Sequence, residues 1–395
     1  MVYTLRQGGE QMPWKVLSQM ELKMQLVRDW NEKHMNVTDL AQKFKISRPT
    51  VYKWLQRHEQ LGVEGLKEVS RAPKHSPYRT AGEIVDLIVA EKLKNRKWGP
   101  RKIRAHVKRE HPELSIPAVS TVGYWLKKEG LVQKRKKRPH VPPYTQPFYG
   151  CEASNDTWSI DYKGQFFMKN GCICYPLTIT DNYSRFLLGC EALEGPRYEP
   201  TRRSIESIFR QYGLPDAIRT DNGVPFAGKG IGGLSRLTVW WILLGIIPER
   251  IGKGCPHENG RHERMHRTLK EEALSPVAAD LKAQQEAFDR FRYEYNTLRP
   301  HESLGDGVPH EHYTKSTRPY VENPHPPEYG HDYTVRQVRH SGEIKFAGRM
   351  IYVSELLSGL PVGLKETDDG LWKLCFSFYT LGSLDLKKNR VIRNG

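Results

Sequence analysis

The apolar residues of the N-terminal third recur every three or four positions, a spacing that predicts amphipathic helices. Ser18 can cap the first helix, which is expected to run to about His34. Its buried face is expected to repeat every four residues, at Leu22, Leu26 and Trp30. This part of the chain is therefore expected to be α-helical.

A pair of further helices follows, joined by a tight turn. Thr38 can cap the short first helix and Ser47 the longer second one, where Pro49 is tolerated in the first turn. This arrangement predicts a helix-turn-helix domain over residues 1–69. The second helix would present these side chains to a DNA major groove: Arg48, Thr50, Tyr52, Lys53 and Arg57. A three-helix bundle with a merely basic face is the alternative.

A second helical unit is expected over residues 81–132, after a basic, proline-containing linker at 70–80. Its first helix is patterned by Ile84, Leu87, Ile88 and Leu93. Pro100 opens its second helix. The third, within 115–130, starts with Ser-Ile-Pro and carries Trp-Leu, which echoes the helix capped by Ser47. These features predict a second helix-turn-helix domain.

The clearest linker in the chain spans residues 133–149. Its prolines prevent a helix, and its run of consecutive cations cannot pack together. The run suits either a phosphate backbone or a solvated hinge, and it comprises Lys134, Arg135, Lys136, Lys137 and Arg138.

In the central third the pattern changes from helical to extended. Residues 157–167 and 173–180 alternate, which predicts two antiparallel strands joined by a turn that contains glycine. An amphipathic helix over 201–212 follows, then a short strand that ends at Asp221, and a long charged helix after Gly260. The expected order of elements is β-β-β-α-β-α.

Three carboxylates hold positions in this pattern that favour chemistry. Asp161 lies in the first strand among aromatic residues, where a carboxylate is costly unless a partner such as a metal ion satisfies it. Asp221 ends a strand beside an Asn-Gly turn, which leaves it open to a ligand. Glu263 lies near the start of the charged helix. A solvated surface helix is the alternative for that last stretch.

Beyond a linker at 315–330 that is rich in proline and histidine, the chain alternates in short stretches. The expected strands are 333–339, 343–348, 349–353, 361–366 and 371–376. Asp368-Asp369-Gly370 fits a hairpin turn between the last two. The pattern predicts a small β-barrel domain over 331–395, with a role in DNA contact or in assembly.

Composition narrows the classes of function. The 395 residues carry a formal net charge of +17, more than solubility requires, which favours a polyanionic partner. No stretch approaches the length of an apolar membrane span, and six cysteines without a CxxC pair argue against a disulfide framework or a zinc ribbon. A soluble intracellular protein that handles nucleic acid is expected.

Four stretches carry a family resemblance: WSID, RTDNGVPF, PHENGRHERMHRTLK and YNTLRPHESL. They resemble the core of DDE transposases and retroviral-type integrases and, among these, bacterial insertion-sequence transposases of the IS481 type. The resemblance covers about 150–313 and implies an RNase H-like α/β catalytic domain at 150–314. It also implies that Asp161, Asp221 and Glu263 are the catalytic and metal-binding carboxylates. The whole chain is then a multidomain α+β protein.

Other acids compete for these roles. Asp181 follows a strand but has the context of an ordinary turn, and Asp156 is expected to be a cap. Glu258 precedes Gly260, whereas the family pattern places the third acid three residues after that glycine, at Glu263. The interval between the second and third acids, 42 residues, is long for the family. Its extra material is expected to be a loop and the start of a helix.

These residue types suit the joining of DNA. Water, and then a 3′-hydroxyl, must attack a phosphodiester in line, and two Mg²⁺ ions can activate the nucleophile and stabilise the leaving oxygen. Magnesium prefers carboxylate oxygens, so three acids suit it, and Mn²⁺ is expected to substitute. Asp161 is expected to bridge both ions, with Asp221 on one and Glu263 on the other.

The expected function is a DNA transposase or integrase that cuts at element ends and transfers the 3′-OH ends into target DNA. Expected partners are double-stranded terminal inverted repeats, target DNA and further copies of the chain, at the nucleoid of a bacterial cytoplasm. Arg299 and His301 are expected to support the active site structurally. Candidate DNA contacts beside it, with solvated helix charges as the alternative for each, are Lys253, Asn259, Arg261, His262, His266, Arg267 and Lys270. A catalytically inactive DNA-binding regulator and a nuclease of the same fold are the alternatives.

Overall fold

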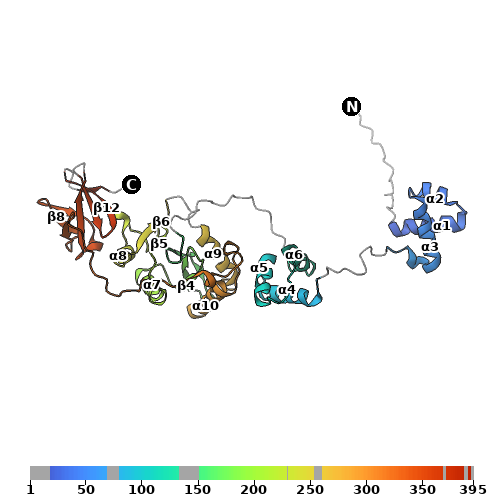
Figure 1. Cartoon of the computed structure of the whole chain (residues 1–395), viewed down its shortest axis with the longest axis horizontal. Helices are drawn as coiled ribbons and strands as arrows, with labels where there is room; N and C mark the ends of the chain where they lie inside the picture. The colour runs from blue at the N-terminus through green and yellow to red at the C-terminus, as the bar shows by residue number, and fades with distance from the viewer. Residues whose placement is uncertain are drawn as a thin grey trace, which may run out of the picture. The chain divides into compact units, whose positions relative to one another are not determined.

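The fold was analysed in a computed structural model (Figure 1). The structure describes residues 18–68, 80–132, 151–228, 230–252, 260–367, 371–386 and 390–392. The chain divides into two compact units, residues 1–79 and 80–395, which are described separately below. Among the described helices, none has the length and apolar character needed to cross a membrane.

The first unit is a helix-turn-helix domain. It contains α1 (Gln19–Lys33), α2 (Val37–Lys43) and α3 (Arg48–Leu61), followed by a short 3₁₀ helix. Leu40 of α2 and Val51 of α3 pack against α1 in its small core. Two of the predicted caps hold their places, because Ser18 precedes α1 with a full capping box and Ser47 precedes α3. The cap of α2 is Asn36 and not Thr38.

The predicted buried face of α1 is wrong at two of its three positions. Leu22 and Trp30 are 40% and 39% exposed, whereas Leu26 is buried as expected. The other buried positions are Val27 and Asp29, and the Asp29 carboxylate lies 2.6 Å from Lys43 Nζ of α2. A strict four-residue repeat drifts around a helix of 3.6 residues per turn. The packing of α2 and α3 therefore selects a face that the repeat does not give.

The second helical domain belongs to the larger unit. Its helices are α4 (Gly82–Lys94), α5 (Pro100–Glu110) and α6 (Val119–Lys128). Pro100 opens α5 as predicted, but α6 begins at Val119, past the Ser-Ile-Pro stretch expected to open it. The core is formed by Ile88, Ile103, Val107, Val122 and Leu126. Leu93, expected to be part of the apolar pattern, is 49% exposed.

The catalytic domain is built on one mixed sheet. Its strands are β1 (Thr157–Tyr162), β2 (Phe166–Phe167), β3 (Ile173–Asp181), β4 (Leu187–Leu193), β5 (Ala217–Thr220) and β6 (Ile247–Arg250). The hydrogen-bonded order is β2-β3-β1-β5-β6, with β4 also paired to β3. β3 runs antiparallel to β1 and β4, whereas β1, β5 and β6 are mutually parallel. This arrangement fits the expected RNase H-like fold.

Helices cover both faces of the sheet (Figure 1). On one face α7 (Tyr198–Tyr212) and α8 (Arg236–Leu243) pack on inward residues such as Trp158 and Ile160 of β1. On the other face α9 (Gly260–Glu272) and α10 (Leu281–Thr297) pack through Met265, Leu269 and Phe288. Because side chains alternate along a strand, Asp161 faces the side opposite Ile160, the side that α9 covers. A short α11 (Pro309–His312) follows.

The long interval between the second and third acids contains more structure than predicted. α8 matches the expected start of a helix, but the parallel strand β6 that follows it was not anticipated. β6 lies at the edge of the sheet, and its Ile247 is 49% exposed. An edge strand of four residues gives no clear apolar alternation, which explains why the pattern did not reveal it.

The C-terminal strands form an open sheet and a hairpin. The strands are β7 (Thr334–Gln337), β8 (Glu343–Phe346), β9 (Arg349–Tyr352), β10 (Pro361–Glu366), β11 (Trp372–Phe376), β12 (Tyr379–Asp385) and β13 (Arg390–Ile392). The sheet order is β13-β12-β11-β10-β7, and β8 pairs with β9 alone. Strand pairing among the described residues thus closes no barrel, and the predicted small β-barrel is not confirmed. The expected turn at 368–370 lies outside the described residues.

The C-terminal sheet shares a core with the catalytic domain. Leu234, Val239 and Ile242, from α8 and the turn before it, are buried together with apolar residues of the C-terminal strands. Tyr379 Oη also donates a hydrogen bond to the Gly232 carbonyl at 3.0 Å. The extra material in the catalytic domain is therefore the surface on which the C-terminal domain packs.

Candidate active site

Asp161 and Asp221 lie on neighbouring parallel strands. β1 pairs with β5 in a register that sets Ser159 opposite Arg219. Continuing this register by two residues places Asp161 of β1 opposite Asp221, the first residue past β5, at a strand spacing of about 4.8 Å. Both carboxylates are half-buried. The register of these parallel strands therefore predicts that the two aspartates lie side by side.

The turn after β5 is fitted to the Asp221 side chain. The Gly223 backbone N–H donates to Asp221 Oδ1 at 3.0 Å, and Asn222 Nδ2 donates to the Ile251 carbonyl at 2.9 Å. A Cβ atom on residue 223 would lie 2.9 Å from Asp221 Oδ2, closer than real Cβ contacts allow. Only glycine at position 223 leaves this carboxylate where it is.

Glu263 lies in the first turn of α9. The helix turns His262, Met265, His266 and Leu269 toward the sheet and leaves Glu263 exposed. Arg261 Nη1 donates to the Asn182 carbonyl at 3.2 Å, which fixes the first turn of α9 beside the end of β3. Glu263 and His266 share a helical face because they lie three residues apart. The histidine contacts described next hold this part of the helix beside Asp161.

Two buried histidines of α9 anchor the helix to β3. Thr178 Oγ1 lies 2.7 Å from His262 Nε2 and 2.7 Å from His266 Nε2. His262 Nδ1 lies 3.1 Å from Thr180 Oγ1. Thr178 is the cross-strand partner of Asp161, and His266 Nδ1 lies 3.9 Å from Asp161 Oδ2. The anchor of the helix thus lies directly beside β1, the strand that carries Asp161.

The expectation that His262 and His266 contact DNA is wrong. Their side chains are buried, at 2% and 6% exposure. Burial lowers the pKa of His262 to about 3; burial and then the neighbouring His262 and Lys163 lower the pKa of His266 to about 2. Both rings are therefore neutral at physiological pH. Their spacing with Met265 and Leu269 on one helical face was the signal that they are buried.

The rival acids fall into structural roles. Asp181 is fully buried and accepts hydrogen bonds from the Asn155 N–H at 2.9 Å and from the N–H and Oγ of Ser184. Burial raises the pKa of Asp181. Asp156 accepts from two backbone N–H groups of the preceding turn, as the expected cap would. Glu258 lies outside the described residues.

Arg299 and His301 hold the end of α10 against α9, consistent with structural support. Arg299 is buried and forms an ion pair with Glu272, the last residue of α9. The His301 ring packs edge-on against Tyr295 with centroids 4.7 Å apart. Burial lowers the pKa of His301 to about 3. These contacts link the catalytic helix to the segment that follows α10.

The predicted DNA-contact residues divide by exposure. On α3, Arg48, Tyr52 and Lys53 are exposed, whereas Thr50 and Arg57 are half-buried. On α9, Arg267 and Lys270 are exposed and Arg261 is half-buried. Those outside the described residues are Lys134, Arg135, Lys136, Lys137, Arg138, Lys253 and Asn259.

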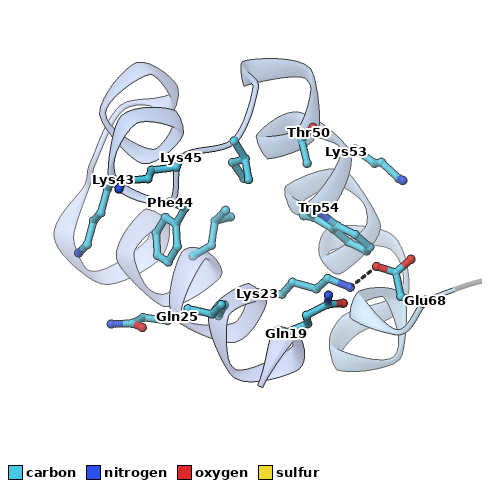
Figure 2. A pocket seen from close by; sticks show the side chains of 13 residues that line it. Gln19, Lys23, Gln25, Lys43, Phe44, Lys45, Thr50, Lys53, Trp54 and Glu68 are labelled. Carbon is cyan, nitrogen blue, oxygen red and sulfur yellow. Dashed lines mark hydrogen bonds and ion pairs between the residues drawn. The ribbon is translucent and has the colours of Figure 1, made fainter. Parts of the chain in front are cut away.

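A cavity of about 650 Å³ lies within the first unit (Figure 2). Residues of α1, the α2–α3 turn and α3 line it, among them Lys45, Lys53 and Trp54. Lys23 Nζ lies 3.8 Å from the centroid of the Trp54 ring and 2.8 Å from Glu68, an ion pair drawn in Figure 2. These contacts hold α1 against the recognition helix α3.

The ligand atoms that these side chains offer suit a divalent cation. Oxygen ligands from Asp161, Asp221 and Glu263 suit Mg²⁺ or Mn²⁺. Among the described residues, the group whose ligand atoms all lie within 4.8 Å of one another is Asp161, His262 and His266. Asp161 belongs to both sets, so it is the residue around which a metal site would form.

Family models match four parts of the chain. Two integrase core domain models match residues 152–256 and 244–309. A helix-turn-helix domain model matches residues 22–74, and a homeodomain-like domain model matches residues 50–126. The integrase core matches cover the sheet, α9 and the three acids.

Similar proteins come from bacterial insertion elements. The uncharacterised 31.7 kDa protein of insertion element IS407 from Burkholderia multivorans is 27% identical over 242 residues, which are 60% of this chain and 82% of that protein. The uncharacterised 39.2 kDa protein of insertion element IS476 from Xanthomonas euvesicatoria is 25% identical over 237 residues, 59% of this chain and 65% of that protein. The alignment thus spans just under two thirds of the second relative.

Among solved structures, the HTLV-2 integrase catalytic core domain in complex with magnesium matches 41% of this chain and 99% of that one, at 14% identity and a TM-score of 0.33. The integrase core matches and the insertion-element relatives agree with the resemblance carried by the sequence motifs. Over residues 152–309 the chain carries an integrase core domain, which is the core of the DDE transposase and integrase superfamily of polynucleotidyl transferases.

Proposed function

We propose that this chain is a DNA transposase of the IS481 type that binds terminal inverted repeats and transfers 3′-OH ends into target DNA. The observation that supports this most is the parallel pairing of β1, which carries Asp161, with β5, which ends just before Asp221. The helix that carries Glu263 is anchored on Thr178, the cross-strand partner of Asp161. In this proposal, three carboxylates carried by β1, by the turn after β5 and by α9 hold the metal ions, and no side chain needs to form a covalent intermediate.

The three acids have separate tasks in this proposal. Asp161, in the middle, would bridge two divalent cations, with Asp221 holding one and Glu263 the other. When bound, such cations lower the pKa of the attacking hydroxyl and neutralise charge on the phosphate. In cleavage, a bond forms from water oxygen to phosphorus and the P–O3′ bond breaks, which leaves a 3′-hydroxyl. In transfer, that hydroxyl attacks a target phosphodiester and releases a new 3′ end.

The remaining domains would supply DNA binding. The formal net charge of +17 favours a polyanion, and Arg48, Tyr52 and Lys53 are exposed on the recognition helix α3. Both ends of an element must be held for joint transfer, so we propose that copies of the chain assemble on the DNA. The work would take place at the nucleoid in the bacterial cytoplasm.

A joining assay tests this function. The full chain is incubated with a candidate end duplex, a target plasmid and Mg²⁺, and products are resolved on a gel. Joined products support a transposase, cleavage alone supports a nuclease, and binding alone supports a regulator. Asp161→Asn, Asp221→Asn and Glu263→Gln should each abolish joining. Glu271→Gln, at an exposed position of the same helix α9, is the control and should keep activity. Substantial joining by any of the three active-site variants would overturn the assignment.

A further inference from the structure

We propose that His266 supplies a nitrogen ligand, through Nδ1, to the cation held by Asp161, and that the site therefore favours manganese over magnesium. This inference rests on the proposed function, because it takes Asp161 to be a metal ligand. It adds His266 to the three carboxylates as a metal ligand. It also predicts a preference for Mn²⁺ over Mg²⁺, which the carboxylates alone do not provide.

The geometry places the two atoms at a distance that a cation can span. His266 Nδ1 lies 3.9 Å from Asp161 Oδ2. Metal bonds to nitrogen or oxygen are about 2.1 Å long, so two of them reach about 4 Å through a shared ion. The distance is too long for a direct hydrogen bond. The two atoms are therefore within the distance that one shared ion can bridge.

The hydrogen bonds of Thr178 determine which nitrogen of His266 is available. Its hydroxyl donates its single proton to the Asp161 carbonyl oxygen at 3.1 Å. A hydroxyl oxygen has two further positions, and both can only accept. The Nε2 atoms of His262 and His266, each 2.7 Å from that oxygen, must then carry the protons and donate. In a neutral ring this leaves Nδ1 of His266 with a free lone pair, on the side of Asp161.

His262 acts as a positioning residue in this arrangement. Its Nε2–H fills the second acceptor position of Thr178, and its Nδ1 lies 3.1 Å from the Thr180 hydroxyl, which can donate to it. Both rings are buried, which favours their neutral forms. A metal-binding histidine in proteins usually donates its other ring N–H to a fixed acceptor, and Thr178 provides one.

A nitrogen ligand changes which ion is preferred. Mg²⁺ takes oxygen ligands almost exclusively, whereas first-row transition metals accept imidazole nitrogen readily. Mn²⁺ binds carboxylates as Mg²⁺ does, so it is the ion that tolerates the mixed donor set with the least change in the rest of the site. The proposed preference for Mn²⁺ therefore applies to the ion that Asp161 and His266 would bind together.

Pulsed electron paramagnetic resonance of the full chain loaded with Mn²⁺ tests the inference. We expect modulation from a coordinated ¹⁴N nucleus, replaced by the ¹⁵N pattern when the chain is labelled with ¹⁵N-histidine. His266→Asn should lose the nitrogen signal, whereas His325→Asn, at an exposed position, should keep it. Wild-type chain without nitrogen coupling, or coupling that survives His266→Asn, would overturn the proposal. The labelled wild-type measurement does not depend on the folding of any variant.

Measuring the affinity of the chain for Mn²⁺ and for Mg²⁺ by titration gives a second readout. His266→Asn should weaken Mn²⁺ binding by about tenfold or more, with a much smaller effect on Mg²⁺. Equal losses for both ions would contradict the proposed ligand. The joining assay separates this inference from the function. If the chain joins DNA with Mg²⁺ but shows no nitrogen coupling, the transposase function is supported and His266 is not a metal ligand. If it shows nitrogen coupling but does not join DNA, His266 is a metal ligand and the proposed function is wrong.

Discussion

Thr178 on β3 and His262 on α9 are joined by a contact of 2.7 Å between Oγ1 and Nε2. The contact ties the helix that carries Glu263 to the strand that pairs with Asp161. A single hydroxyl therefore links two elements that are far apart in the sequence and that must meet for three carboxylates to act together.

Removing that hydroxyl should loosen the site. In Thr178→Val two buried imidazole N–H groups lose their acceptor, so we expect a loss of about 1–3 kcal/mol in the free energy of unfolding. Thr178→Ser keeps the hydroxyl and is the matched control, with a smaller loss. Urea denaturation of both variants measures this. Equal stability of Thr178→Val and the wild type would show that the contact does not anchor α9.

The two aspartates at 181 and 221 should respond differently to substitution. Asp181→Ala leaves three buried donors without their acceptor, so we expect a loss of about 3 kcal/mol or more in unfolding free energy. Asp221→Ala, at a half-buried position in a turn, should cost about 1 kcal/mol or less while abolishing joining. Thermal unfolding and the joining assay together check this pair. A stable, inactive Asp181→Ala chain would make Asp181 the better catalytic candidate.

Gly223→Ala should reduce activity without unfolding the chain. The added Cβ would meet Asp221 Oδ2 at 2.9 Å and push that carboxylate away from its position. The loop is partly exposed and can give, so the stability change should be about 1 kcal/mol or less. Joining should fall by about a hundredfold, as expected for a misplaced catalytic group. Gly348→Ala, in a turn of the C-terminal hairpin, is a control that should keep activity.

Recognition-helix variants should weaken DNA binding and change its salt dependence. Arg48→Ala and Lys53→Ala each remove an exposed cation from α3. If either contacts a phosphate, the slope of log affinity against log salt should fall by about one. Fluorescence anisotropy with an end duplex measures this, with Arg28→Ala on α1 as control. An unchanged slope in both α3 variants would remove α3 from the DNA interface.

Stability should decline in mild acid because of buried histidines. Burial lowers the pKa of His301 to about 3, from an ordinary value of 6.5. The unfolded chain therefore binds a proton below pH 6.5 that the folded chain does not. The stability is complete above pH 6.5 and falls toward pH 3, by about 1.4 kcal/mol per pH unit for each such histidine. Urea denaturation at pH 7.5 and 5.0 measures the decline, which should be shallower in His301→Phe. An identical decline in His301→Phe would contradict the lowered pKa of His301.

The sequence predicted those features that depend on local rules. Ser18 caps α1 by accepting a backbone N–H, Ser47 precedes α3 with its hydroxyl on that of Thr50, and Pro100 opens α5 because its ring fits a first turn. Asp161 was placed correctly within a strand because of the apolar alternation around it. Asp221 was placed correctly at the end of a strand because an Asn-Gly turn follows it. Such features require knowledge of only a few neighbouring residues.

The features that were wrong or missed depend on distant parts of the chain. Leu22 and Trp30 are exposed because α2 and α3 pack on a neighbouring face of α1. His262 and His266 lie among charged residues in the sequence; their helical spacing with Met265 indicated a buried face, but only the structure shows that β3 provides their partner. The edge strand β6 forms only because β5 offers a parallel neighbour. In each case the deciding partner is remote in sequence.

The shared core between α8 and the C-terminal sheet limits how the protein can be shortened. Leu234, Val239 and Ile242 have their apolar partners in the last third of the chain. A fragment that ends after α11 would expose them to solvent, next to the strand that leads to Glu263. Loss of activity in such a truncation would therefore report a damaged catalytic domain and not a missing DNA contact. The smallest fragment suited to biochemical work retains the C-terminal strands.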